Sequence, residues 1–305
     1  MNNENAIVWF DSDLDGMCSY LAFCWLNGEF FPYKTSTLKK FGVDYNKWKT
    51  ENEDKYDKIY ILDMDISENA ELIDIPKVTI IDHHETHLKS ITKYKNAKTI
   101  VELCTSCTKL IIKAYKDKLS KLTKPHLNLL NYYQLAELKL LLLADDYDCY
   151  ALKYPDSYKL NVVLWSLTGD RFGKFIKQFK DGFNGFTEYN LNSIRIHTNK
   201  LESLKKEIEI HRGTVKIGEE THQIVSTICE YALNEIADYL IEKYDDDICI
   251  IINPTGGYAS FRRGKRCKIA LNKLAEDLCD GGGHEYAAGG KLTDKFLEFT
   301  KLINQ

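Results

Sequence analysis

Three short apolar runs in the first half of the chain stop abruptly at acidic or histidine residues. The runs cover residues 6–10, 58–62 and 78–81, and an aspartate follows each of them directly. Brief, uninterrupted apolar runs of this kind are typical of strands that are buried on both faces of a parallel sheet. Open α/β sheets usually bind their ligands at the carboxyl ends of such strands. The pattern therefore predicts an α/β fold with polar side chains gathered at one edge of its sheet.

A polar, charge-rich stretch at residues 189–212 separates this α/β pattern from a second one. Leu201, Leu204 and Ile208 recur there at helical spacing, which predicts either a helix that bridges two domains or a solvated surface helix. We expect an N-terminal domain with a mostly parallel sheet flanked by helices, then a helical linker, then a smaller α/β C-terminal domain. Their expected ranges are 1–188, 189–212 and 213–305.

The composition indicates a globular protein of the cell interior. Hydrophobic residues make up 44% of the chain and charged residues 28%, which suits a large core and excludes a disordered chain. No apolar run approaches the roughly 20 residues that span a bilayer, and the polar N-terminus does not resemble a signal peptide. The nine cysteines are expected to be reduced thiols in the cytoplasm. A net charge of −4 gives no general attraction for nucleic acid.

Four groups of acidic and histidine residues point to a common site. Taken singly, an aspartate after a strand is commonly a turn former or a helix N-cap, because its side chain accepts hydrogen bonds from backbone N–H groups. Taken together, three strand ends would bring several like charges to one sheet edge, where they repel one another strongly. The groups are Asp11, Asp13 and Asp15; Asp63 and Asp65; Asp82, His83 and His84; and Asp145, Asp146 and Asp148.

Bound divalent cations would turn this repulsion into attraction. Ligands that are mostly carboxylates with a minority of imidazole suit Mn²⁺ or Mg²⁺ better than Zn²⁺, which favours sulfur and nitrogen. Two such ions in one site can activate a water molecule and stabilise the in-line displacement of a phosphoryl group. The sequence therefore predicts a two-metal hydrolase site.

The order and content of these motifs resemble the DHH phosphoesterase superfamily, which takes its name from the tripeptide found here at residues 82–84. A glycine-rich segment near the C-terminus is similar to the signature of the DHH-associated C-terminal domain. The resemblance covers residues 7–290, nearly the whole chain. The five segments that carry it, in order, are FDSDLDG at 10–16, LDMD at 62–65, IDHH at 81–84, ADDYD at 144–148 and GGGHEYAAG at 281–289.

The resemblance implies a metal-binding role for five residues and makes Mn²⁺ the first choice of ion, with Mg²⁺ as the alternative. Asp13 would ligate one ion and Asp15 the other, with Asp63 bridging them. His83 would ligate the second ion, and Asp145 would complete its shell.

Two further residues of the third motif acquire roles in the same way. Asp82 would orient the ligating histidine, His83, by a hydrogen bond from outside the metal shell. His84 would contact the substrate phosphate or help the leaving group. The nucleophile would be a hydroxide that bridges the two ions, so no covalent intermediate with the protein is expected.

Two departures from the family pattern leave choices open. Many members have a histidine four residues before the position of Asp13, where this chain has Trp9, and Asp11 is the natural substitute as a ligand. In the fourth motif Asp145 and Asp146 are adjacent. Asp145 follows Ala144 as the family pattern suggests, and Asp146 is the alternative ligand.

The C-terminal signature implies a substrate-binding surface. Glycines let backbone N–H groups approach an anion closely, whereas a tight structural turn is the alternative interpretation. The segment ASFRR at 259–263 resembles the strand on which family members place phosphate-contacting serine and arginine, within a local basic patch. The resemblance thus puts the active site in the cleft between the domains, with Ser260, Arg262, Gly282, Gly283 and His284 on the substrate.

Two other features are expected to be structural. Cys104 and Cys107 have a C-x-x-C spacing, but no second pair accompanies them, so we expect them to pack in the interior. His87 has no partner at ligand spacing and is expected to be an ordinary surface or core histidine.

The functional hypothesis is a metal-dependent phosphodiesterase acting on short oligonucleotides, as nanoRNases do, or on single-stranded nucleic acid, as RecJ-type exonucleases do. A cyclic-dinucleotide phosphodiesterase, or another small nucleotide phosphatase, is the nearest alternative. An inorganic pyrophosphatase would have a similar metal site, but the glycine-rich signature argues against it. A binding module without catalysis would have no reason to keep crowded carboxylates.

Overall fold

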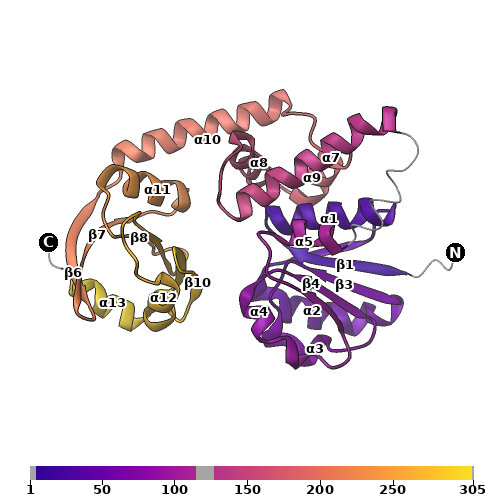
Figure 1. Ribbon diagram of the computed structural model, residues 1–305, viewed down its shortest axis with the longest axis horizontal. Helices are drawn as coiled ribbons and strands as arrows, with labels where there is room; N and C mark the ends of the chain where they lie inside the picture. Colours follow the sequence, from indigo (N-terminus) through magenta and orange to yellow (C-terminus); the bar gives the residue numbers. More distant parts are fainter. Residues whose placement is uncertain (1–4, 115–126, 304–305) are drawn as a thin grey trace. The chain divides into compact units, whose positions relative to one another are not determined.

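The chain forms two compact units, Met1–Ile194 and Arg195–Gln305, in a computed structural model that describes residues 5–114 and 127–303. Each unit has its own β-sheet (Figure 1). Each also has its own hydrophobic cores. Helix α10 (Glu188–Glu207) spans the boundary along the chain, while the domain limits at residues 188 and 212 stay predictions. No helix among the described residues combines the length and the apolar character that a membrane span requires.

The first unit is built on a sheet of five parallel strands in the order β2-β1-β3-β4-β5, which confirms the predicted α/β class. The apolar runs at residues 6–10, 58–62 and 78–81 form its central strands. The strand bounds are β1 (Ala6–Asp11), β2 (Tyr33–Ser36), β3 (Lys58–Leu62), β4 (Val78–Asp82) and β5 (Lys98–Val101).

The register of these strands explains why their polar ends meet. Phe10 pairs with Leu62, and Leu62 pairs with Ile81, so three neighbouring strands end at the same level. The next residues along the chain are therefore delivered to one edge of the sheet. These residues are Asp11, Asp63 and Asp82.

Helices cover both faces of this sheet (Figure 1). Side chains alternate along β1, so that Phe10 faces the core beside α1 while Trp9 faces the core beside α2. The helix bounds are α1 (Leu14–Asn27), α2 (Leu38–Asn52), α3 (Ala70–Ile73), α4 (Glu85–Lys89), α5 (Cys107–Ala114), α7 (Leu127–Asp148), α8 (Pro155–Ser166) and α9 (Arg171–Phe179), with 3-10 turns at Glu53–Lys55, Ser67–Asn69 and Ile91–Lys93.

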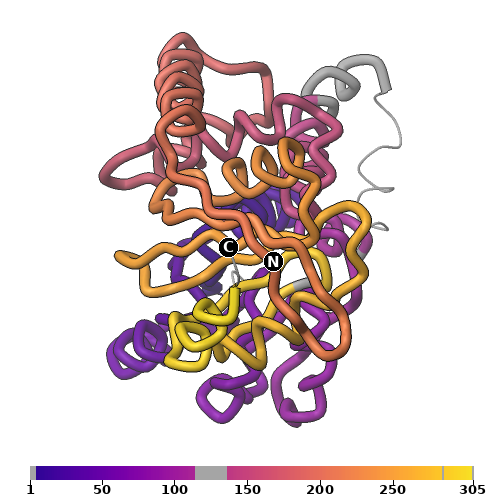
Figure 2. The backbone as a smooth tube through the Cα atoms, turned by 90° about the vertical axis from the view of Figure 1, so that its left-hand side faces the viewer, coloured from indigo at the N-terminus to yellow at the C-terminus, as the bar shows by residue number. Residues whose placement is uncertain are grey.

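The second unit contains a mixed sheet in the order β10-β11-β9-β8-β7-β6, in which β7 and β8 are the one parallel pair among the described strands. Figure 2 traces the backbone of this unit from orange to yellow. Helix α11 packs with one hydrophobic core of this unit, and α12 and α13 pack with the other. The bounds are β6 (His211–Ile217), β7 (Glu220–Ile228), α11 (Leu233–Tyr244), β8 (Ile248–Asn253), β9 (Tyr258–Arg263), α12 (Leu271–Cys279), β10 (Gly282–His284), β11 (Ala287–Lys291) and α13 (Asp294–Lys301).

Candidate metal centre

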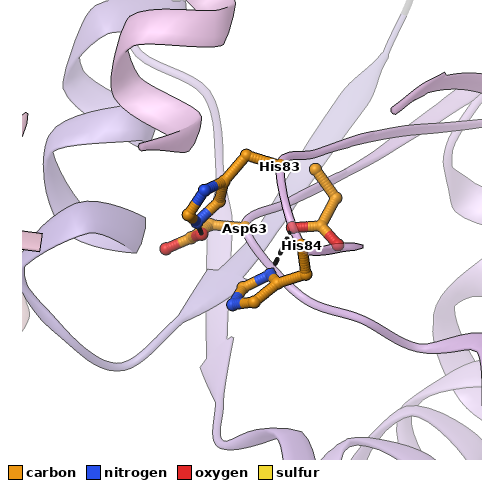
Figure 3. A group of neighbouring side chains, drawn as sticks. Asp63, His83 and His84 are labelled. Carbon is orange, nitrogen blue, oxygen red and sulfur yellow. Dashed lines mark hydrogen bonds and ion pairs between the residues drawn. The ribbon is translucent and has the colours of Figure 1, made fainter. Parts of the chain in front are cut away.

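The imidazole of His83 stands at the centre of a group of carboxylates that come from three different elements. Its Nε2 atom lies 3.3 Å from Oδ1 of Asp63, 3.6 Å from Oδ2 of Asp148 and 3.7 Å from Oδ2 of Asp15. Asp63 follows β3, Asp148 ends α7, and Asp15 lies in the first turn of α1. Figure 3 shows the carboxylate of Asp63 against the ring of His83. Three of the expected ligands are thus brought together with a carboxylate that was not expected.

A backbone carbonyl fixes the orientation of the His83 ring. Its Nδ1 atom lies 3.1 Å from the carbonyl oxygen of Cys104. Because a carbonyl oxygen only accepts hydrogen bonds, Nδ1 carries the hydrogen and donates it. Nε2 is then the ring nitrogen that faces the carboxylates, and it is the atom through which this imidazole could ligate a metal ion.

Asp15 lies in α1, and its buried carboxylate faces the N-terminus of a second helix, α5. Its two oxygens accept hydrogen bonds from the backbone N–H groups of Cys107, at 2.6 Å, and Thr108, at 3.0 Å, in the first turn of α5. Such N–H groups have no partner within their own helix and favour an anion. The fold therefore supports a negative charge at Asp15 beside Nε2 of His83.

Asp13 and Asp11 lie next to this group but have other contacts as well. Asp13 is the N-cap of α1, and its Oδ1 accepts a hydrogen bond of 2.9 Å from the N–H of Gly16. Burial and the charge of Asp15 raise the pKa of Asp13. Asp11 accepts a 2.5 Å hydrogen bond from the N–H of Ser12, and burial together with Asp13 raises the pKa of Asp11 to about 7. Neither contacts His83 within ion-pair distance in the described residues, so their metal-binding roles stay predictions.

Asp63 carries the strongest signs that a cation belongs in this group. Its backbone has a φ of +59°, in the left-handed region that non-glycine residues seldom adopt. Its Oδ1 atom is buried and has no hydrogen-bond partner among the described residues. Burial and the charges of Asp15 and Asp13 raise the pKa of Asp63 well above its usual range. A carboxylate kept in this state costs free energy unless an ion compensates it, so the donors present fit a divalent metal ion.

Asp82 orients His84 and His87 rather than His83, which corrects the expected role of this aspartate. Its Oδ1 lies 2.7 Å from Nδ1 of His84, and its Oδ2 lies 2.6 Å from Nδ1 of His87. Burial opposes the charge on His84, but the hydrogen bond and charge of Asp82 raise the pKa of His84 to about 9. The rings of His83 and His84 lie side by side with centroids 4.5 Å apart (Figure 3). His84 is thus held in place through Nδ1 and keeps Nε2 for other contacts.

His87 was expected to be ordinary, yet it is completely buried and takes part in this network. Its Nε2 atom lies 3.0 Å from the hydroxyl of Tyr94, so both of its ring nitrogens are used. The sequence signal that could have revealed it is its position in the short helix α4 (Glu85–Lys89), one turn after the third motif, where its side chain can turn back to Asp82.

The fourth motif contributes Asp148, and not Asp145 or Asp146, to the group around His83. Asp145 accepts hydrogen bonds from the hydroxyls of Thr105 and Ser106, the latter at 2.8 Å. Burial and the charges of Asp15 and Asp13 raise the pKa of Asp148 well above its usual range, as they do for Asp63. The geometry therefore favours Asp148 over Asp145 in the group around His83.

Asp146, the alternative ligand, is buried and has a structural set of partners. Its carboxylate accepts hydrogen bonds from the backbone N–H groups of Lys153 and Tyr154, both at 3.0 Å, and from the hydroxyl of Ser157 at 2.7 Å. These contacts fix the start of α8, where Tyr154 is the N-cap residue. Successive residues of a helix point in different directions, so the three acidic residues that end α7 serve three separate purposes.

Trp9, which stands where many family members have a histidine, does not face the candidate site. Its ring is buried in an aromatic core, with ring centroids 5.6 Å from Phe41, 5.4 Å from Tyr45 and 5.5 Å from Trp48. The alternation of side chains along β1 turns it toward α2. Asp11 follows two residues later, at the strand end.

The expected substrate-binding residues of the second unit lie on neighbouring strands. Ser260 and Arg262 alternate along β9 with the buried residues Ala259 and Phe261, and so share the opposite face of the sheet. The register joins Ser260 to Gly289, and Gly289 to Gly282. Arg262 donates a hydrogen bond of 2.5 Å from Nη2 to Oδ1 of Asn234 in α11.

The glycines of the signature differ in what they require. A Cβ atom at Gly283, whose φ is +133°, would lie 2.6 Å from the carbonyl oxygen of Ala287, so this position needs glycine for the backbone itself. A Cβ atom at Gly282 would meet nothing within 4 Å. The backbone of His284 pairs with Ala287, and its side chain lies outside the described part of the structure.

Comparisons with known proteins agree with this architecture. Residues 223–305 match the family model of the DHHA1 domain, whereas a search of curated proteins gave no match. The structure is similar to that of a DHH-domain protein described as a member of a family of ribosomal proteins, with a TM-score of 0.64, 13% identity and coverage of 98% of this chain and 86% of that one.

Two other similar structures are those of a protein with bound Mn²⁺ and of a phosphodiesterase. For RecJ of Thermus thermophilus, in complex with Mn²⁺, the TM-score is 0.56 at 13% identity, covering 98% of this chain and 51% of that one. For PggH of Vibrio cholerae, a pGpG-specific phosphodiesterase, the TM-score is 0.53 at 11% identity, covering 98% of this chain and 96% of that one.

The fold and the site place this chain in a class of α/β proteins. Proteins of this class have two units, with carboxylates and histidines at the carboxyl edge of a parallel sheet. The DHHA1 match of residues 223–305 and the fold shared with DHH-domain structures agree with the resemblance to the DHH phosphoesterase superfamily. The acidic cluster around His83 is a site that could hold metal.

Proposed function

We propose that this protein is a metal-dependent phosphodiesterase that hydrolyses short oligonucleotides or single-stranded nucleic acid, with two divalent ions, Mn²⁺ in the first place. The observation that carries the proposal is the convergence of Asp15, Asp63 and Asp148 on Nε2 of His83. Carboxylates in the majority with one imidazole are the donor set expected for Mn²⁺ or Mg²⁺. The Mn²⁺ in the similar RecJ structure supports this choice of ion.

Asp15, Asp63, His83 and Asp148 would hold the ions, and Asp13 and Asp11 stand close enough in sequence to complete their shells. When bound, two divalent ions activate water and neutralise the charge that develops on a phosphate during its displacement. The fold contributes a ring at His83 that is already oriented and a carboxylate at Asp63 whose Oδ1 accepts no hydrogen bond among the described residues and lies 3.3 Å from Nε2 of that ring.

His84 is proposed to contact the substrate phosphate. Asp82 holds its Nδ1, so that the ring cannot turn freely and Nε2 remains available to donate to a phosphate oxygen. His87, whose Nε2 is bonded to Tyr94, in turn holds Asp82 from the interior. In the second unit we propose that Ser260, Arg262, Gly282, Gly283 and His284 bind the substrate.

The substrate class is proposed as a nucleotide phosphodiester because of the similar proteins. RecJ is an exonuclease, and PggH is specific for the linear dinucleotide pGpG. A linear dinucleotide is a short oligonucleotide, which favours this class over long strands. A cyclic dinucleotide or another small nucleotide phosphate is the second candidate, and the same residues would serve it.

A substrate panel tests the proposal. The purified chain is incubated with Mn²⁺ or Mg²⁺ and with labelled dinucleotides, longer single strands, cyclic dinucleotides and pyrophosphate. Cleavage of the linear dinucleotides or single strands is the expected result. Cleavage of cyclic dinucleotides alone would establish the second candidate, and pyrophosphate as sole substrate would contradict both. No hydrolysis of any substrate with either ion would sink the enzyme hypothesis.

Replacing Arg262 with alanine is expected to raise KM about tenfold or more while kcat changes little. A guanidinium that contacts a phosphate remote from the reacting bond contributes binding energy to ground state and transition state alike. Steady-state kinetics with the best substrate of the panel measures both constants. Arg266, which is exposed and pairs with Asp245 at 2.6 Å, provides the matched control variant Arg266→Ala. A fall in kcat at constant KM would place Arg262 in the chemical step instead.

A further inference from the structure

One short stretch of chain, residues 104–108, sets the position of two of the proposed metal ligands. The carbonyl oxygen of Cys104 accepts the hydrogen bond from Nδ1 of His83. The N–H groups of Cys107 and Thr108 donate to the carboxylate of Asp15. Cys107 is buried, as predicted, but the stretch does more than pack. Any shift of this stretch would move an imidazole and a carboxylate of the site together.

Asp145 ties this stretch to helix α7. Its Oδ1 accepts hydrogen bonds from the hydroxyls of Thr105 and Ser106, and its Oδ2 lies 3.6 Å from Nζ of Lys109. Lys109 also donates a 2.9 Å hydrogen bond to the hydroxyl of Thr105. Both oxygens of Asp145 are therefore engaged, Oδ1 by side chains of this stretch and Oδ2 by Lys109, the residue that follows it.

The same helix also reaches the other side of the His83 ring. Asp148 lies three residues after Asp145 in α7, nearly one helical turn away, and its Oδ2 lies 3.6 Å from Nε2 of His83. Helix α7 thus contacts Nε2 of His83 directly, through the carboxylate of Asp148. Its connection to Nδ1 is indirect: Asp145 holds residues 105 and 106, and the neighbouring carbonyl of Cys104 accepts from Nδ1.

We infer that Asp145 is a positioning residue of the metal centre, which sets His83 and Asp15 through residues 104–108 without ligating the metal itself. The inference rests on the proposed function, because it concerns the affinity of the same site for its ions. Groups that orient metal ligands from outside the metal shell typically change affinity about 10-fold to 100-fold when removed.

Calorimetric titration of the full chain with Mn²⁺ tests this role. Asp145→Ala is expected to bind the same number of ions as the wild type with about 10-fold to 100-fold lower affinity. Asp145→Asn should stay close to the wild type, because its amide oxygen still accepts from the hydroxyls of Thr105 and Ser106. Asp156→Ala is the matched control, since Asp156 is an aspartate in α8 whose carboxylate pairs with Lys159 at 3.1 Å.

A second measurement follows the His83 ring without metal. Nitrogen-15 NMR of the histidines should show a hydrogen-bonded Nδ1–H at His83 in the wild type and in Asp145→Asn, and a weakening of this hydrogen bond in Asp145→Ala. If Asp145→Ala does not fold, as judged by its melting curve, Thr105→Val removes one of the two hydroxyls with little change in volume and is expected to weaken Mn²⁺ binding in the same direction.

The outcomes separate this inference from the proposed function. Loss of one ion from the stoichiometry in both Asp145→Ala and Asp145→Asn would make Asp145 a ligand and overturn the inference. Unchanged affinity and an unchanged Nδ1–H hydrogen bond of His83 in Asp145→Ala would overturn it as well. If the wild type binds no Mn²⁺, the proposed function fails, while the NMR comparison still decides whether Asp145 positions His83.

Discussion

Replacing Asp63 with asparagine is expected to abolish hydrolysis and at the same time to raise the melting temperature of the metal-free protein. The carboxylate is buried beside Asp15 and Asp13, its Oδ1 has no hydrogen-bond partner among the described residues, and its pKa is raised well above the usual range. Without metal this charge destabilises the fold, and an amide of the same shape removes it. With metal the same charge is what holds the ion.

Two assays check the opposite signs of this prediction. The value of kcat/KM should fall by more than about 100-fold, the upper end of the loss typical for residues that only orient a ligand. In the presence of a chelator, each kcal/mol of relieved repulsion should raise the melting temperature by roughly 2–4 °C. Asp65→Asn is the control, because Asp65 lies two residues further on and accepts a hydrogen bond from the N–H of Ser67. A variant that keeps its activity would show that Asp63 is misassigned, and a lower melting temperature would contradict the charge argument.

The part of the site that comes from the parallel sheet could be predicted from the sequence. Short apolar runs predict buried parallel strands, and the residues directly after such strands meet at one edge of the sheet. Asp63 and His83 are adjacent to such strand ends, and the structure brings them to 3.3 Å. The alternation of apolar and polar residues along β9 likewise predicts that Arg262 and Phe261 point to opposite faces of the sheet. The structure agrees, because Phe261 lies in the hydrophobic core.

The features that depend on tertiary packing could not be predicted from neighbouring residues in the sequence. Asp145, Asp146 and Asp148 form one acidic run, and only the packing of α7 against residues 104–106 and the start of α8 decides which side chain goes where. The expected role of Asp82 was wrong for a related reason. A carboxylate on a strand end has several histidines within reach, and the turn into α4 brings His84 and His87 to it while His83 turns away to Cys104.

A pair of substitutions in this acidic run is expected to separate catalysis from folding. Asp148→Asn should lower kcat/KM by more than about 100-fold while the metal-free fold stays as stable or becomes more so, since Asp148 is a crowded carboxylate with a raised pKa. Asp146→Asn should lower the free energy of unfolding by about 1–3 kcal/mol, because one acceptor oxygen becomes a donor facing the N–H of Tyr154 and the hydroxyl of Ser157.

Both variants carry the same aspartate-to-asparagine change, two residues apart on the same helix. A difference between them therefore reflects the surroundings of each carboxylate and not the type of substitution. Chemical denaturation with a chelator measures stability, and initial rates at a temperature well below both melting points measure activity. Asp146→Asn should retain most of the wild-type rate there, because its contacts fix the start of α8 and do not reach His83. The reverse pattern, an inactive but stable Asp146→Asn beside an active Asp148→Asn, would return the metal-binding role to Asp146. Because burial and neighbouring carboxylates raise the pKa of Asp148, whereas Asp146 accepts from three donors, we expect the first pattern.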